Sequence, residues 1–515
     1  MKRIILIMLA AIMLIAAGCS GGSANELPQS SAAAQPTAQA AKTPEPTPEP
    51  NALAVNENAD KASNFTLEIT LDPEKHSLSV NQKIDYLNPS GDALSQIYFN
   101  VIPDAFKKDG GGTSVKSIKI AGEQTSMKNV KGTVYSADIP TPVKKGKRTE
   151  IELVYEVNIP NIVNRFGYQE TYFNLGNFII TPAVYEKGGY VSQPYVDLGD
   201  AFYTDIANYD VKINVPEGYK TAATGEKGED GAYHAKNVRD FAFCASDKYE
   251  TLETDANGVK VTAYFGSELE LTAKRVIDVA KKSLILLSEK FGQYPYKTLD
   301  VVMNGLTSGV NGMEYPALIM IAPEVPLEVF ADEGMDYDTD QNAVPTVLSL
   351  DDSVCHEVAH QWFYGIVGNN QVTEAWLDEG FARFCEFLYE STYPPHLTEE
   401  NEYFLKENRM KSIAESVMGD GDDDTQDSKD DRPKLTKSLY YWMENDAMSY
   451  SDIYEYGSAL IYSIYNEMGE EEFFKAAKEY VKTFKYGFVT TEDFKEFWSK
   501  RADVKGILVA FIAED

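Results

Sequence analysis

Residues 356–360 read His-Glu-Val-Ala-His, a run of residue types that can hold and use a metal ion. Residues four apart on a helix lie on one face, so His356 and His360 are expected to share one cation. Imidazole nitrogens suit Zn²⁺, which in catalytic sites keeps three protein ligands and an open position for water. Glu357 lies between the histidines, where its carboxylate can take a proton from that water. The run therefore predicts a metal-activated water with a carboxylate base.

A third ligand is expected from the block at 376–380, which reads Trp-Leu-Asp-Glu-Gly. Glu379 in this block would complete a site for one zinc ion per chain, with Glu374 as an alternative carboxylate. Structural zinc sites usually have four protein ligands and much Cys, so this set favours a catalytic zinc. The alternative is a helix with two solvated histidines, although the chain has only five histidines in total.

The first residues have the parts of a secretory signal, namely a basic start and an apolar run over residues 4–17. The run is too short to favour a membrane-spanning helix. Cys19 follows Ala-Ala-Gly and resembles the cysteine of bacterial lipoprotein signals that receives lipid. Residues 1–19 are therefore predicted to be a lipoprotein signal peptide, with an ordinary cleaved signal as the alternative. The lipid would anchor the protein to the cell membrane, on the extracytoplasmic face of a bacterial cell.

Residues 20–63 are rich in Ala, Pro, Ser, Thr and Gln, and are predicted to be a disordered tether. The chain of 515 residues has a formal net charge of -33, which argues against nucleic acid as a partner. Besides Cys19 there are Cys244, Cys355 and Cys385, so the chain is no disulfide scaffold. Whether Cys355 and Cys385 pair stays open, although buried free thiols are the commoner case.

Two folded parts are predicted after the tether, so the chain is expected to be multidomain. Residues 64–255 alternate apolar and polar side chains between turn signals, which predicts an all-β, sandwich-like domain. Residues 256–515 have mostly helical periodicity, with strands at 298–303 and near 315–322, which predicts an α+β, mostly helical domain. An acidic run at 420–427 lacks the pattern of an EF-hand loop, so a solvated insert is favoured over calcium binding.

The metal motif and the block at 376–380 resemble the membrane alanyl aminopeptidase family of zinc metallopeptidases, in the gluzincin clan. Residues 311–316, Asn-Gly-Met-Glu-Tyr-Pro, resemble the G-A-M-E-N motif of that family. Residues 454–457, Tyr-Glu-Tyr-Gly, resemble its Y-E-K-G segment. The resemblance implies a thermolysin-like catalytic domain and a short form that lacks the C-terminal domains of the larger members.

The resemblance also implies a role for each matching residue. Glu357 would be the general base, and Tyr454 would donate a hydrogen bond to the developing oxyanion. Glu314, with Gly312 and Met313 beside it, would bind the substrate through its free α-amino group.

Glu386 follows Glu379 by two helical turns and is expected on the same helical face. Metal-bound histidines usually donate their second N–H to a carboxylate or carbonyl. Glu386 is therefore expected to accept this hydrogen bond from His356, with an exposed helix residue as the alternative.

The implied function is a zinc-dependent aminopeptidase that hydrolyses the N-terminal bond of peptides with a free N-terminus at the cell surface. A zinc endopeptidase or another hydrolase on the same scaffold is one alternative. A peptide-binding surface lipoprotein without catalysis is another. Asn311 and Tyr315 depart from the family motif, so the contact with the substrate backbone is expected to differ.

Overall fold

The computed structural model describes residues 62–306, 310–323, 325–419, 435–445 and 447–512. Cys19, the predicted signal and tether up to residue 61, and the acidic run at 420–427 lie outside these residues. Among the described residues, no helix has both the length and the apolar character needed to cross a bilayer.

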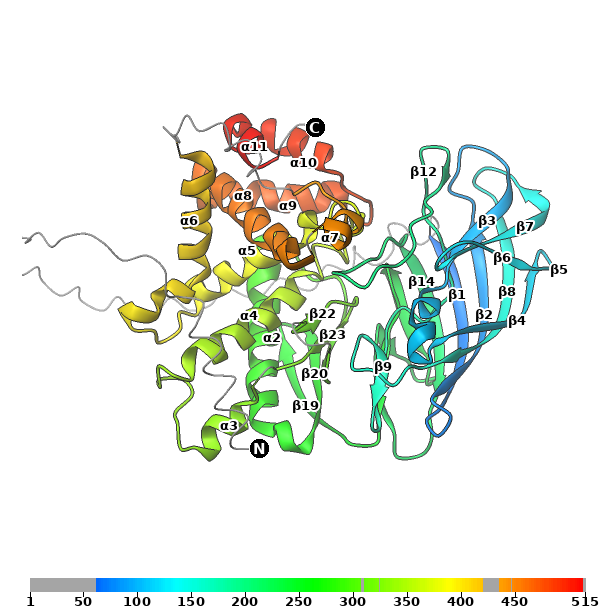
Figure 1. Cartoon of the computed structure of the whole chain (residues 1–515), viewed down its shortest axis with the longest axis horizontal. Helices are drawn as coiled ribbons and strands as arrows, with labels where there is room; N and C mark the ends of the chain where they lie inside the picture. The colour runs from blue at the N-terminus through cyan, green and yellow to red at the C-terminus, as the bar shows by residue number, and fades with distance from the viewer. Residues whose placement is uncertain (1–61, 307–309, 324, 420–434, 446, 513–515) are drawn as a thin grey trace, which may run out of the picture. The chain divides into compact units, whose positions relative to one another are not determined.

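An eight-stranded sheet forms most of the N-terminal part, and Figure 1 shows its long strands side by side. In sheet order the strands are β16 (Glu226–Lys227), β17 (Tyr233–Val238), β14 (Ala207–Asn214), β1 (Ser63–Asp72), β2 (Ser77–Leu87), β8 (Arg148–Asn158), β4 (Gly112–Ile120) and β5 (Glu123–Thr125). Residues of β2 alternate between buried and exposed, because successive side chains of a strand point to opposite faces. The outer face carries cross-strand ion pairs such as Lys83 with Glu150.

Two four-stranded sheets and a hairpin complete the N-terminal part. The first sheet has the order β15 (Lys220–Ala223), β18 (Phe243–Ser246), β10 (Tyr172–Leu175), β9 (Phe166–Gln169). The second has the order β11 (Thr181–Pro182), β3 (Leu94–Asn100), β7 (Val134–Val143), β6 (Met127–Lys131). The hairpin joins β12 (Tyr185–Glu186) to β13 (Gly189–Tyr190), and the short 3₁₀ helix η1 spans Ile102–Asp109. One apolar core serves these sheets, which confirms the predicted sandwich-like fold class.

A five-stranded sheet begins the C-terminal part. Its order is β19 (Tyr249–Ala256), β20 (Val259–Gly266), β21 (Thr298–Met303), β23 (Leu318–Ile321), β22 (Gly312–Met313). The predicted boundary between 255 and 256 falls inside the β19–β20 hairpin, which pairs with β21 and not with the N-terminal sheets. The β22 strand is the edge of this sheet and is antiparallel to β23.

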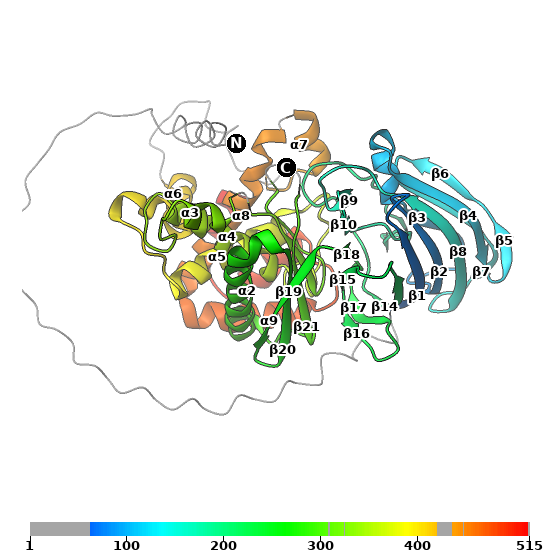
Figure 2. The ribbon, with the colours of Figure 1, turned by 90° about the horizontal axis from the view of Figure 1, so that it is seen from below.

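Helices make up the rest of the C-terminal part, as predicted for an α+β, mostly helical domain. They are α2 (Glu270–Phe291), α3 (Leu327–Asp332), α4 (Val344–Ala359), α5 (Trp376–Thr392), α6 (Lys406–Met418), α7 (Leu439–Asn445), α8 (Asp452–Met468), α9 (Glu470–Phe484), α10 (Thr491–Ser499) and α11 (Lys505–Phe511). Short 3₁₀ helices are η2 (Ser267–Leu269), η3 (Glu399–Phe404) and η4 (Ala447–Ser451). Figure 2 shows α2 along β19 and β20, and one apolar core joins this sheet to the helices.

Two glycines allow α5 and α8 to approach each other closely. A Cβ atom at Gly457 would lie 3.0 Å from the Cα of Gly380, and one at Gly380 would lie 2.9 Å from the carbonyl carbon of Gly457. Larger residues would push the helices apart, since such contacts are tighter than van der Waals distance. Cys355 on α4 and Cys385 on α5 are both buried and free, and the Cys355 thiol donates to the Cys385 carbonyl at 3.4 Å.

Candidate metal centre

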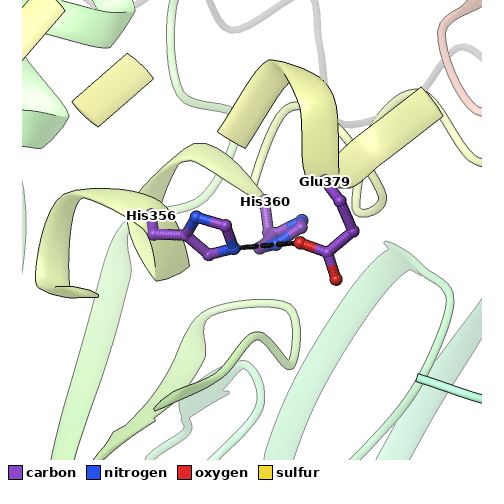
Figure 3. Close-up of side chains that lie close together, drawn as sticks. All are labelled: His356, His360 and Glu379. Carbon is purple, nitrogen blue, oxygen red and sulfur yellow. Dashed lines mark hydrogen bonds and ion pairs between the residues drawn. The ribbon is translucent and has the colours of Figure 1, made fainter. Parts of the chain in front are cut away.

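The structure brings His356, His360 and Glu379 together (Figure 3). The Nε2 atoms of the two histidines are 3.1 Å apart. Glu379 Oε2 lies 3.0 Å from His356 Nε2 and 3.4 Å from His360 Nε2. All three side chains are largely removed from solvent, with His356 the most exposed of them. The three atoms therefore converge on one point at the surface of α4.

Two helix ends position these side chains. His356 lies in the last turn of α4, and His360 is the residue that caps its C-terminus. Glu379 lies in the first turn of α5, which starts at Trp376. The loop between the helices therefore sets where the carboxylate meets the histidines.

In each candidate ligand, the polar atom that does not face the other two ligands has a hydrogen-bond partner of its own. His356 Nδ1 donates to Glu386 Oε1 at 2.8 Å, and His360 Nδ1 donates to the Phe363 carbonyl at 2.9 Å. Glu379 Oε1 accepts a hydrogen bond from the Tyr454 hydroxyl at 2.8 Å. These contacts leave both Nε2 atoms and Glu379 Oε2 facing the shared point, as in metal sites with oriented ligands.

The donor set fits a zinc ion. Ligand atoms around a tetrahedral zinc lie roughly 3.4 Å apart, since each bond is about 2.1 Å. The measured separations of 3.0, 3.1 and 3.4 Å are close to this value. Burial alone would lower the pKa of His356, but hydrogen bonds to Glu379 and Glu386 raise it to about 10. A bound cation would displace the protons that His356 and His360 otherwise share with Glu379, because a metal ligand must be neutral imidazole.

The Glu357 carboxyl lies close enough to His356 and His360 for their charges to act on it. Its Oε2 atom is buried and has no hydrogen-bond partner within the described part of the chain. Burial raises the pKa of this carboxyl to about 7, although the neighbouring histidines lower it. Gly312 lies directly against Glu357, because a Cβ atom at Gly312 would overlap the carboxylate. A glycine at the sheet edge therefore leaves room for the carboxylate.

Glu314 follows the edge strand β22 and is only 2% exposed. Its Oε1 accepts a hydrogen bond from Gln371 Nε2 at 3.0 Å. No ion-pair partner of Glu314 is found among the residues that the structure describes. Burial, and next the nearby carboxylate of Asp200, raise its pKa well above the usual range. Met313 beside it is buried in a small apolar cluster.

Tyr454 on α8 lies next to the ligand set. Its ring is 5.9 Å from that of His356, and its hydroxyl contacts Glu379 as described above. The predicted site residues His356, Glu357, His360, Glu379 and Tyr454 therefore lie together. Their assigned roles stay predictions that the geometry allows.

The alternative ligand and one departure from the motif lie elsewhere. Glu374 Oε1 accepts from the Thr491 backbone N–H at 2.7 Å, at the start of α10. Tyr315 is fully buried, and its hydroxyl donates to Asn177 Oδ1 at 2.5 Å. The Tyr315 side chain therefore packs into the body of the protein.

Three polar contacts at the site had no place in the sequence-based predictions. They are Gln371 against Glu314, the Phe363 carbonyl against His360, and Asp200 near Glu314, paired with Arg165. Only Gln371 has a sequence signal, because the run Asn369-Asn370-Gln371 is polar yet lies between two apolar helices. The contacts of the Phe363 carbonyl and of Asp200 depend on loop conformations that the sequence does not indicate.

Comparison with protein families identifies the domain that contains this site. The model of the peptidase family M1 domain matches residues 275–511, a range that includes every residue of the metal centre. The chain carries a peptidase family M1 domain. The M1 domain thus begins within α2 and runs through α11.

The curated relatives that this chain matches include several aminopeptidases. Aminopeptidase M1-D of Oryza sativa subsp. japonica is 28% identical over 265 residues, which cover 50% of this chain and 27% of the relative. Aminopeptidase 2, mitochondrial, of Saccharomyces cerevisiae is 26% identical over 313 residues, which cover 60% of this chain and 29% of the relative. The chain therefore spans less than a third of the length of these two relatives.

Solved structures share the fold over most of the chain. The M1 zinc metallopeptidase from Deinococcus radiodurans has a TM-score of 0.58 and 17% identity, covering 88% of this chain and 94% of that chain. A mutant of that enzyme bound to a Tyr-Ser-Ala substrate has a TM-score of 0.56 and 18% identity, with the same coverage of both chains. Both the β part and the helical part therefore have counterparts in a known M1 fold.

Proposed function

We propose that this protein is a zinc-dependent aminopeptidase that removes the N-terminal residue from peptides. The convergence of His356, His360 and Glu379 beside the unpartnered carboxylate of Glu357 carries the proposal. The M1 family match and the aminopeptidase relatives support it. The proposed cofactor is one zinc ion per chain, held by these two histidines and Glu379.

Each residue has a defined task in this proposal. Zinc, when bound, would polarise the scissile carbonyl and lower the pKa of water. Glu357 takes a proton from the attacking water and passes it to the leaving amine. Its buried and unpartnered Oε2 suits this task, because no hydrogen bond competes for the proton. Tyr454 donates a hydrogen bond from its hydroxyl to the carbonyl oxygen as negative charge develops there.

Glu314 is the proposed anchor for the free α-amino group. A buried carboxylate without a cation is costly, and a substrate ammonium would supply the missing charge. Gln371 holds one oxygen of Glu314, which fixes the direction of the carboxylate. An anchor for an N-terminal ammonium limits cleavage to the first peptide bond.

The decisive experiment compares free and blocked peptides. Purified protein should cleave amino-acid amides and short peptides, should lose activity with a chelator, and should regain it with zinc. N-acetylated versions of the same peptides should be poor substrates. The Glu314→Gln variant should lose roughly 30- to several-thousand-fold in kcat/KM on free peptides, because a buried charge-assisted contact is removed. Equal cleavage of free and acetylated peptides would instead support an endopeptidase.

A variant of the base separates the enzyme from a peptide-binding protein without catalysis. Glu357→Gln should keep its zinc content but lose kcat by orders of magnitude. Peptide binding without turnover by the wild type would favour the non-catalytic alternative.

We also propose that Cys19 is lipidated and anchors the protein at the extracytoplasmic face of a bacterial membrane. The signal-like residues 1–19 and the Ala/Pro-rich stretch at 20–63 support this location. Labelling with a radioactive fatty acid should mark the wild type and leave Cys19→Ser unmarked. Equal labelling of both proteins would contradict the lipid anchor.

A further inference from the structure

Arg239 is a buried arginine in the connection between β17 and β18 of the N-terminal part. Its guanidinium donates to three backbone carbonyls, those of Tyr364 at 2.7 Å, Gly487 at 2.5 Å and Thr204 at 3.3 Å. It also lies 4.6 Å from the centre of the Phe488 ring. Within the described residues it has no carboxylate at ion-pair distance. Burying a charged guanidinium without a carboxylate partner costs free energy. The burial of Arg239 at this place therefore indicates a specific role.

The carbonyl nearest to Arg239 belongs to a strained turn. Tyr364 has a φ of 116°, in a region that bulky residues rarely adopt. Such a conformation is strained and persists only where surrounding contacts enforce it. The turn follows α4 directly, and the Gly365 N–H donates to the His360 carbonyl at 2.9 Å.

Contacts from the N-terminal part hold Tyr364 at two places. Arg239 holds its carbonyl, and Asp240 Oδ2 accepts from its hydroxyl at 2.8 Å. The Tyr364 N–H is also held, because it donates to the Val367 carbonyl at 2.8 Å. Side chain, carbonyl and amide are thus all fixed, and with them the torsion about the N–Cα bond.

That torsion controls a carbonyl at the metal site. Rotation about the N–Cα bond of Tyr364 swings the preceding peptide unit, which carries the Phe363 oxygen. The same oxygen accepts the hydrogen bond from His360 Nδ1 at 2.9 Å. This hydrogen bond keeps the proton of His360 on Nδ1 and leaves Nε2 free to bind a cation.

We propose that Arg239 and Asp240 are positioning residues for the metal centre and act through Tyr364 and the Phe363 carbonyl. Two adjacent residues of the N-terminal β part thereby set the direction of His360, a ligand on the C-terminal part. This inference rests on the proposed zinc site. If these contacts orient His360, full zinc affinity requires the N-terminal β part.

The test removes one hydroxyl from the chain of contacts. Tyr364→Phe keeps the ring and deletes the hydrogen bond to Asp240. Tyr296→Phe is the matched control, because its hydroxyl donates to the Asn237 carbonyl near the same connection and not to an atom of the turn. Zinc affinity of full-length protein is measured by competition with a chromophoric chelator. Tyr364→Phe should bind zinc about 10–100-fold more weakly, and Tyr296→Phe should match the wild type.

A second variant and a spectroscopic readout separate positioning from folding. Asp240→Leu keeps a side chain of similar shape but removes the oxygen that accepts from the Tyr364 hydroxyl, so it should also weaken zinc binding. With Co²⁺ in place of zinc, both variants should show altered visible absorption, since His360 would meet the ion at a different angle. Unchanged affinity and spectra, with only a lower Tm, would overturn the positioning role. Failure of the wild type itself to bind zinc would contradict the proposed function and, with it, this inference.

Discussion

The carboxylates around the metal centre differ in how their charge is satisfied. Glu386 accepts from His356, and its other oxygen lies 3.1 Å from Lys406 Nζ and 3.3 Å from Arg383 Nη1. Burial opposes ionisation of Glu386, but these cations outweigh it and lower its pKa to about 2. Among the described residues, Glu357 and Glu314 have no Lys or Arg at ion-pair distance, and burial raises the pKa of both more than the nearby histidines lower it. The two carboxylates without a Lys or Arg partner are thus the ones proposed to contact the attacking water and the substrate.

Tyr454→Phe tests the proposed oxyanion contact. The variant should lose about 10²–10³-fold in kcat with a smaller change in KM, because the lost hydrogen bond forms mainly in the transition state. Zinc content should stay near that of the wild type. The control is Tyr462→Phe on the same helix α8, whose hydroxyl contacts Glu407 at 3.2 Å, away from the ligands. Near-normal kcat for Tyr454→Phe would assign the oxyanion contact to another group.

At the residue scale, the sequence is most informative where short-range geometry decides the outcome. His356 and His360 converge because a helix places residues four apart on one face. Glu386 was expected beside His356 for the same reason, and the structure places it 2.8 Å away. The Phe363 carbonyl could not be expected, since its direction follows from a strained turn that distant contacts hold.

At the scale of elements, periodicity located the strands and helices well. The alternation of apolar and polar residues in the predicted all-β region, for example over 65–71 and 150–157, falls within β1 and β8. The helix α4, which carries both histidines, starts at Val344 with a proline in its first turn. The β19 strand was assigned to the wrong side of the domain boundary, because its partner β20 pairs in parallel with the later strand β21. Strand periodicity does not reveal which sheet a strand joins.

The close approach of α5 and α8 predicts a coupling between helix packing and activity. Gly457→Ala would add a methyl group 3.0 Å from the Cα of Gly380 and should cost about 1–3 kcal/mol of stability. It should also reduce kcat, since Tyr454 and Glu379 lie within one turn of the two glycines. Gly506→Ala on α11 is the control, because its added methyl group would meet no atom within 4 Å. Thermal unfolding and kinetics of both variants check this, and a stable, fully active Gly457→Ala would exclude the coupling.

At the scale of the whole molecule, the N-terminal and C-terminal parts share buried polar contacts. Arg239 reaches the Tyr364 and Gly487 carbonyls, and Asp300 on β21 accepts from the Ala223 backbone N–H on β15 at 3.1 Å. Asp300 is 9% exposed, and burial raises its pKa from 3.8 to about 7. The two parts are therefore joined through groups whose desolvation has to be compensated by specific partners. Such a junction couples the fold of one part to the site in the other.

The raised pKa of Asp300 predicts how stability depends on pH. The folded protein binds the Asp300 proton more tightly than the unfolded chain, whose pKa is near 3.8. This contribution to stability is fully present below that value and is lost as pH rises toward 7. Asp300→Asn removes the titration, and an amide oxygen can still accept from Ala223. Relative to the variant, the wild type should therefore lose on the order of 2–3 kcal/mol of stability between pH 5 and pH 8.

Thermal unfolding of wild type and Asp300→Asn across this pH range provides the measurement. The difference in Tm between them should grow in favour of the variant as pH rises. Asp138→Asn is the control, because Asp138 is exposed on β7 and hydrogen bonds from Lys128 and Gln96 lower its pKa. Asp138 is therefore ionised throughout this range, and its replacement should leave the pH dependence unchanged. Parallel curves for wild type and Asp300→Asn would show that Asp300 is charged in the folded protein, with a cation or solvent at the junction to stabilise it.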